Sequence, residues 1–283
     1  MKRLYVSTGT MVARDNGYDY MRALGEIKRL EQQGLCDGLE LMMLKFYYDK
    51  REEVIDAIKS FGVNAATIHC EKDIGTMLSD AGALIEGGET HDAEAMLHDA
   101  IDLFRYNCTF AEKLNIDRMV IHLWGGYNSD SHIEYNIEKY CTLREIAAEY
   151  GVRLLVENIP SRIYDPRSNW HKLLPYLGNG GLVFDTRFGM LHRQIEGILH
   201  DSALTEKIEH VHISDFAGTY RQFRALRPIL HPGEGSVDFV KTAGLLKKIG
   251  YSGTITLESP VVEGEDLDMA KLASTLRFIR ETF

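Results

Sequence analysis

The chain has 283 residues, which is close to the usual span of one α/β barrel. Apolar residues make up 45% of it and only six prolines occur, none gathered into a linker, so we expect a single domain over residues 1–283. The formal net charge of −10 opposes attraction to a phosphate backbone and argues against nucleic acid as a partner.

The first residues and the cysteines indicate the cellular compartment in which the protein is expected. The start, MKRLYVSTGT, lacks the long apolar segment of a signal peptide, and no run approaches membrane-spanning length. Four widely spaced cysteines form no CxxC pair, so we expect buried, reduced thiols. These features predict a cytoplasmic protein with no membrane partner.

Short apolar, β-branched runs alternate with longer stretches of helical period, which is typical of βαβ units around a parallel sheet. The runs expected as strands are residues 4–8, 38–42, 63–69, 118–123, 152–157, 181–185, 208–214 and 253–258. Between them, apolar residues recur at steps of three and four, as from Leu97 to Ala111, and predict helices that cover the sheet. The expected fold is α/β, a single (β/α)8 TIM barrel.

Glycines and loop lengths add detail to this prediction. Left-handed helix caps are expected at Gly34, Gly62, Gly151 and Gly250, each of which separates a helical stretch from the next strand. A doubly wound open sheet is the competing fold, but SerThrGlyThrMet at the end of the first strand is no glycine-rich phosphate loop. The connections over about 71–91 and 215–231 are long enough to serve as lids or binding loops.

Six ionisable side chains end the third to eighth predicted strands. In an α/β barrel these ends surround one mouth, where active sites lie. The six are His69, His122, Glu157, Asp185, His212 and Glu258. Carboxylates around one mouth repel and raise one another's pKa unless a cation neutralises them. We therefore expect Glu157, Asp185, His212 and Glu258 to bind a divalent metal ion.

Three carboxylates and one imidazole form an oxygen-rich donor set. Such a set favours Mn²⁺ and also suits Mg²⁺ or Co²⁺, with Zn²⁺ as a further candidate.

Other residues are candidates near the mouth. Glu40, on the second strand, is expected to contribute to the mouth or to form an ion pair below it. Trp124 could stack on the face of a sugar or cap the barrel as a packed aromatic ring. His210 lies one layer below His212 on the same strand face and is expected to support it.

Several motifs together resemble the xylose isomerase-like TIM barrel superfamily. They are ValGluAsn at Glu157, PheAspThr at Asp185, HisValHisIleSerAsp around His212, ProGlyGluGly at 232–235 and LeuGluSer at Glu258. The superfamily includes sugar and sugar-phosphate isomerases and epimerases, inosose dehydratases and apurinic endonucleases. The resemblance covers nearly the whole chain and implies a small, sugar-like substrate.

The four expected ligands match those of the ketose 3-epimerases, in which both glutamates also move protons. The resemblance therefore implies that Glu157 and Glu258 are catalytic base and acid, acting beside a metal that stabilises an enediolate. The expected enzyme is an isomerase or epimerase of a sugar or sugar derivative. An inosose dehydratase-like lyase, which abstracts the same proton and then expels hydroxide, is the alternative.

Departures from the epimerase pattern concern the substrate. Phe188 stands where those enzymes commonly have a histidine, and Arg187 is the candidate replacement for the lost hydrogen bond. The loop after His212 is either a solvated surface segment or an anion-binding loop. The second alternative follows from its arginines, which pair well with carboxylate or phosphate. Its candidate substrate contacts are Arg224, Arg227 and His231, beside Arg221. An acidic or phosphorylated substrate is compatible with such a loop.

His69 and His122, with Glu157, match the first zinc site of the apurinic endonucleases. They either bind a second metal or hydrogen-bond the substrate and nearby carboxylates. The rest of that family's metal cluster is incomplete, because Phe188, Arg227 and Ile229 replace its ligands. Together with the acidic net charge, this argues against DNA cleavage.

Two alternatives concern activity and assembly. An inactive binding relative would keep the fold without the chemistry. Homo-oligomers are common in the families that the chain resembles, but no feature of the sequence demonstrates one.

Overall fold

The computed structural model describes residues 3–283, and in it eight parallel strands close into a barrel. Each strand pairs with the next one along the chain, and β1 pairs with β8 to complete the ring. The strands are β1 (Leu4–Ser7), β2 (Leu39–Met42), β3 (Ala65–His69), β4 (Arg118–Ile121), β5 (Arg153–Glu157), β6 (Gly181–Asp185), β7 (Ile208–Ile213) and β8 (Thr254–Leu257). The predicted single (β/α)8 barrel is confirmed.

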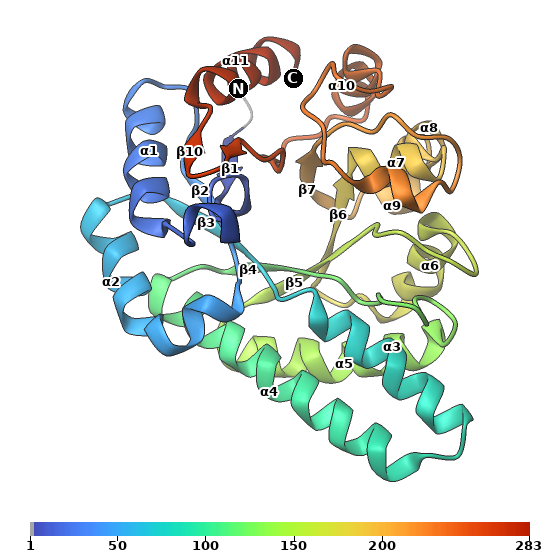
Figure 1. The fold of residues 1–283 in the computed structure, drawn as a ribbon. Helices are drawn as coiled ribbons and strands as arrows, with labels where there is room; N and C mark the ends of the chain where they lie inside the picture. The colour runs from blue at the N-terminus through green and yellow to red at the C-terminus, as the bar shows by residue number, and fades with distance from the viewer. Residues whose placement is uncertain (1–2) are drawn as a thin grey trace.

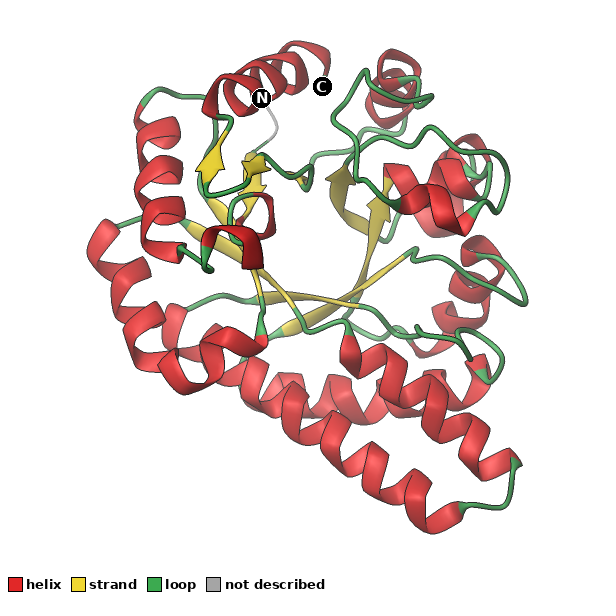
Figure 2. Ribbon diagram, in the orientation of Figure 1, coloured by secondary structure: helices red, strands yellow, loops and turns green. Residues whose placement is uncertain are grey.

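Helices surround the barrel on its outside (Figures 1 and 2). They are α1 (Tyr20–Gln32), α2 (Arg51–Phe61), α3 (Asp73–Glu86), α4 (Thr90–Leu114), α5 (Ile133–Glu149), α6 (Pro166–Leu173), α7 (Thr186–Leu191), α8 (Ile195–Leu199), α9 (Ser202–Thr205), α10 (Phe239–Lys248) and α11 (Met269–Thr282). Five of them, α1, α6, α7, α10 and α11, begin after an aspartate whose side chain accepts a backbone N–H of the first turn. A short hairpin of β9 (Val262–Glu263) and β10 (Asp266–Leu267) precedes α11.

The expected helix caps are also present. Gly34, Gly62, Gly151 and Gly250 all have φ between 58° and 71°, the left-handed conformation that ends a helix without steric cost to glycine. Predicted and observed strands coincide apart from one or two residues at their ends.

The expectation of a long loop over 71–91 was wrong. Most of this segment is α3, and α4 begins at Thr90, so the two helices form the hairpin that projects from the barrel in Figure 1. Gly75 packs where α3 crosses the end of β4, because a Cβ there would lie 2.3 Å from the carbonyl oxygen of His122. The connection over 215–231 is long as predicted and contains only the 3-10 turn η5 (Phe223–Leu226).

The barrel interior has an apolar layer and a polar layer. Val120, Leu155 and Val183 form a small buried cluster, and each lies two residues before a strand-end residue on the same inward face. The four cysteines are free thiols, three of them buried. Among residues 3–283, no helix combines the length and apolar character that crossing a membrane requires.

Candidate functional site

The six strand-end residues of the sequence analysis meet inside the barrel mouth. All are buried, and the most accessible are His122, 9% exposed, and Glu258, 7% exposed. One ligand atom from each of Glu157, Asp185, His212 and Glu258 lies within 4.8 Å of the others. The structure thus brings the four expected metal ligands, here called the four-ligand cluster, to one point.

Asp185 owes its orientation to the start of α7. It is the N-cap residue of this helix, and its Oδ1 accepts the backbone N–H of Phe188 at 2.7 Å. The side chain of Asn158 bonds both the N–H and the carbonyl of Asp185, which fixes the backbone between β5 and β6. Oδ2 of Asp185 is left buried with no hydrogen-bond partner. A ligand for this oxygen is therefore missing from the protein itself.

His212 lies between carboxylates at both ring nitrogens. Its Nε2 is 3.2 Å from Glu40 Oε1, and its Nδ1 is 2.9 Å from Glu157 Oε1 and 3.6 Å from Glu258 Oε1. Because carboxylates only accept hydrogen bonds, a neutral ring that donates Nε2–H to Glu40 turns its Nδ1 lone pair toward two anions. Either a cation lies between these groups or the ring carries a second proton. Without a cation, burial opposes the charged ring, but Glu258, Glu40 and Glu157 outweigh it and raise the pKa of His212 well above its usual value.

Glu40 lies below the mouth and pairs with histidines there. This is the second of the two positions expected for it, the first being a direct contribution to the mouth. It is fully buried, and its Oε2 lies 2.9 Å from Nε2 of His210. Burial alone would raise the pKa of Glu40, but His212 and His210 outweigh that effect and hold the pKa far below its usual value. The arrangement is a carboxylate behind a ligand histidine, which selects the nitrogen that faces a metal.

His69 and His122 both face Glu157. Nε2 of His122 is 2.6 Å from Glu157 Oε2, and Nε2 of His69 is 3.4 Å from the same oxygen. The Nδ1–H of His69 donates to the Cys70 carbonyl at 2.9 Å, which leaves a neutral His69 ring with a buried, unpaired Nε2. Burial lowers the pKa of His122 to about 4, although Glu157 opposes the shift. Since these three ligand atoms also lie within 4.8 Å of one another, both expected roles of the histidines fit the geometry.

The charges of the four-ligand cluster fit a divalent cation. Burial raises the pKa of Asp185 to about 7, an effect that Arg187 opposes and that Glu157 and Glu258 increase. Burial would also raise the pKa of Glu157, but His212 and His122 hold it well below its usual value. Oε1 of Glu258, like Oδ2 of Asp185, is buried without a hydrogen-bond partner. Buried, unpaired carboxylate oxygens around one point are what a hard divalent ion requires.

We expect metal affinity to fall as the pH drops through about 7, the pKa of Asp185 in the metal-free protein. Ligation needs the carboxylate, so below this pH an incoming ion must displace its proton. Titration calorimetry with Mn²⁺, repeated in buffers of different ionisation enthalpy, should show more protons released at about pH 6 than at about pH 8.5. Equal affinity and equal proton release at both pH values would contradict the assignment of Asp185.

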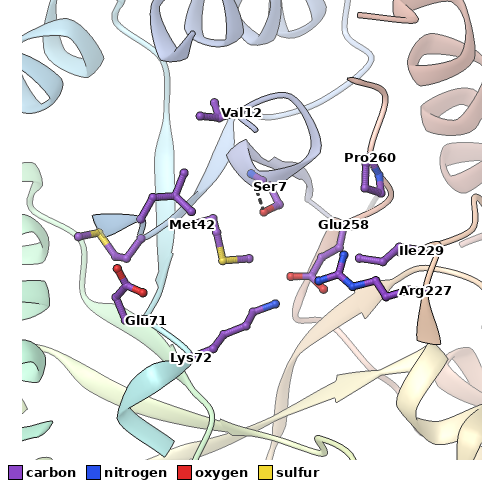
Figure 3. Close-up of a pocket in the computed structure, with 12 residues that line it drawn as sticks. Ser7, Val12, Met42, Glu71, Lys72, Arg227, Ile229, Glu258 and Pro260 are labelled. Atoms are coloured by element: carbon purple, nitrogen blue, oxygen red, sulfur yellow. Dashed lines mark hydrogen bonds between the residues drawn. The ribbon is translucent and has the colours of Figure 1, made fainter. Parts of the chain in front are cut away.

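Two cavities lie at the barrel mouth, and one of them adjoins the four-ligand cluster through Glu258. The first, of about 260 Å³, contains Glu258 and Arg227 together with Lys72 (Figure 3). The second, of about 330 Å³, reaches His122 and contains Lys72 and Arg162. The second has the size of a small-molecule site and the first is slightly smaller, and Lys72 borders both.

Two residues expected to contact substrate lie elsewhere. Trp124 is fully buried, and its indole N–H donates to the Pro160 carbonyl at 3.2 Å, so the ring packs in the barrel instead of presenting a face to a sugar. His231 is 3% exposed, and its ring bridges the Thr275 hydroxyl and the Pro260 carbonyl. Its two nitrogens are therefore engaged in structural bonds.

The arginines have different positions. Arg187 is 4% exposed, and its guanidinium carbon lies 4.5 Å from the centroid of the Phe188 ring. That ring also packs beside His122, with 6.5 Å between centroids, so an apolar group fills the position of the epimerase histidine. Arg227 lines the first cavity, whereas Arg224 is exposed and lines neither.

Lys72 and Arg162 were not expected at the site from sequence. Each follows a strand end, at three residues after β3 and five after β5, and this position was the available signal. Buried Asp130 was also not expected, although its carboxylate accepts the three backbone N–H groups of residues 162–164 and fixes the loop after β5.

Comparisons with known proteins agree with this architecture. The sequence profile described as xylose isomerase-like TIM barrel matches residues 12–282. An uncharacterized protein of Methanocaldococcus jannaschii is 27% identical over 172 residues, which are 58% of this chain, and the chain spans 64% of that relative's length.

Two solved structures have a similar fold. The D-allulose 3-epimerase from Methylomonas sp. gives a TM-score of 0.71 at 16% identity, with 100% of this chain and 98% of that one covered. The IOLI protein, described with a bound zinc atom, also gives 0.71 at 16% identity, with 99% of each chain covered. At these identities the likeness concerns the fold.

Proposed function

The chain belongs to the xylose isomerase-like TIM barrel family, and from this premise we propose that it is a divalent-metal-dependent isomerase or epimerase of a sugar or sugar derivative. The observation that carries the proposal is the approach of four ligand atoms, from Glu157, Asp185, His212 and Glu258, to within 4.8 Å of one another. The epimerase and the zinc-containing protein with a similar fold support it.

The four-ligand cluster would hold the ion. His212 would contribute Nδ1, because Glu40 occupies Nε2. A divalent ion in this place supplies Lewis acidity, which polarises a substrate carbonyl and acidifies the adjacent C–H. The donor set favours Mn²⁺, and Zn²⁺ is the first ion to compare with it because the IOLI structure contains zinc.

Glu157 and Glu258 are the proposed proton carriers. They come from β5 and from the end of β8, so they approach the mouth from different sides of the ring. Glu258 lines the first cavity, whereas Glu157 lies behind His122, whose Nε2 is 2.6 Å from Glu157 Oε2. If one removes a proton and the other returns it from the other side, a stereocentre is inverted or a carbonyl moves.

We expect the protein, loaded with Mn²⁺, to exchange carbon-bound hydrogen of a ketose or sugar derivative with solvent. A panel of ketoses, their phosphates and sugar acids is incubated in D₂O, and deuterium is located by NMR and mass spectrometry. Exchange should disappear on chelation and return with added metal. Loss of water from the product would identify the lyase, and no exchange with any member of the panel would count against the proposal.

A further inference from the structure

Lys72 and Arg162 differ from the many paired cations of the protein. Within residues 3–283, neither side chain forms an ion pair, although both are exposed at the mouth. They share the cavity of about 330 Å³, which contains no acidic residue. His122 also lines this cavity and is 9% exposed. The cavity therefore carries two positive charges that form no ion pair among the described residues, and His122 connects it to Glu157 of the four-ligand cluster. Lys72 also borders the first cavity, which contains Glu71 and Glu258.

Arg162 is held in a defined direction. Asp130 accepts the backbone N–H of Arg162 at 2.7 Å, and the guanidinium carbon lies 5.2 Å from the ring centroid of Phe223 and 6.0 Å from that of Tyr127. Phe223 also lines the cavity. An arginine that stacks on aromatic rings while its donors stay unpaired is prepared to bind an anion.

The wall opposite is formed where two chain segments approach closely. Thr76, in the first turn of α3, faces Gly125 and Gly126 of the loop after β4. A Cβ at Gly126 would lie 2.7 Å from Thr76 Cγ2, and φ at Gly126 is +67°. A larger residue would displace Thr76, whose hydroxyl forms a further polar group of the cavity.

We propose that this cavity binds the phosphate group of a phosphorylated substrate whose hydroxyl and carbonyl end lies at the four-ligand cluster. The part of this inference that concerns the reaction rests on the proposed function. The part that concerns phosphate binding does not. A phosphate monoester carries about 1.5 to 2 negative charges near pH 7 and has three acceptor oxygens, which matches two cations and a hydroxyl. A carboxylate would leave one of the cations uncompensated.

Inorganic phosphate is the probe for the site. Its affinity is measured by calorimetry on the Mg²⁺-loaded protein and again after chelation. Lys72→Gln and Arg162→Gln should each weaken binding by about 10-fold, whereas Arg14→Gln, an exposed arginine lining neither cavity, should change it by less than about 2-fold. Binding should survive chelation, because the proposed site contains no metal ligand of the four-ligand cluster.

The inference would be overturned if neither variant weakened phosphate binding, or if phosphate binding were lost when the metal is removed. It would also be overturned if acetate bound as tightly as phosphate. A fourth contrary result would be turnover of an unphosphorylated ketose as efficient as turnover of its phosphate. Turnover of the unphosphorylated ketose would leave the proposed function intact. Phosphate binding that depends on Lys72 and Arg162, without hydrogen exchange in any sugar phosphate, would support the site and contradict the proposed function instead.

Discussion

Replacement of Glu258 by glutamine should slow solvent-deuterium exchange by at least about 100-fold at saturating Mn²⁺. The amide is nearly isosteric with the carboxylate but cannot accept a proton from carbon. Glu258 lines the first cavity, and its buried Oε1 has no hydrogen-bond partner within residues 3–283. The rate is measured with the best substrate of the panel, at several Mn²⁺ concentrations, to separate the loss of a proton carrier from weakened metal binding.

Glu263→Gln is the matched control, because Glu263 is exposed on the β9–β10 hairpin five residues further along the chain. It should exchange hydrogen at the wild-type rate. A Glu258→Gln protein that binds Mn²⁺ and retains a rate within about 3-fold of wild type would remove Glu258 from the mechanism.

Asp185→Asn should change stability with opposite signs in the metal-free and the metal-loaded protein. Asparagine keeps an oxygen that can accept the Phe188 N–H at the start of α7. It also removes a buried charge, since the pKa of Asp185 in the folded state, about 7, exceeds the ordinary 3.8. A carboxyl whose pKa is raised in the folded state lowers the free energy of unfolding progressively as the pH rises from 3.8 to 7. Above pH 7 the full destabilisation remains.

The metal-free variant should therefore be more stable than wild type at about pH 8, by roughly 1–3 kcal/mol, which corresponds to about 2–4 °C in Tm per kcal/mol. Near pH 4 the gain should vanish. Added Mn²⁺ should raise the Tm of wild type and leave the variant almost unchanged. Thermal unfolding with chelator and with metal checks both signs, with Asp99→Asn on the exposed face of α4 as the control. A metal-free variant less stable than wild type at pH 8 would contradict the unfavourable burial of the Asp185 charge.

The strand ends of the barrel could be predicted because the information is local. A hydrophobic run that stops at an ionisable residue, as at Glu157 and Asp185, marks both the end of a strand and a side chain at the mouth. Closure of the ring then brings distant residues together without further information. The choice between the two positions of Glu40 needed the structure, since it depends on the layer in which His210 and His212 lie.

The residues whose role could not be decided from the sequence are those whose environment is set by packing between segments. Trp124 follows the end of β4 and His231 lies at the end of the connection over 215–231, but the indole N–H of Trp124 donates to the Pro160 carbonyl and Nε2 of His231 bonds the Pro260 carbonyl. The prediction of a long loop over 71–91 missed α3, in which Gly75 allows the helix to cross closely over the end of β4. Lys72 looks in sequence like any solvated lysine, because only the assembled mouth shows that it shares a cavity with Arg162 and that this cavity contains no acidic residue.

The Asp130 carboxylate holds the loop after β5 by accepting hydrogen bonds from three main-chain N–H groups, those of residues 162, 163 and 164. The backbone at residues 162–164 is therefore fixed by Asp130 whichever side chains these three residues carry. A substitution at position 162 exchanges the group presented to the cavity while its backbone support is retained. Substrate preference at this rim can then diverge by single substitutions, at little cost to the fold, while the inward residues that would bind the metal stay the same.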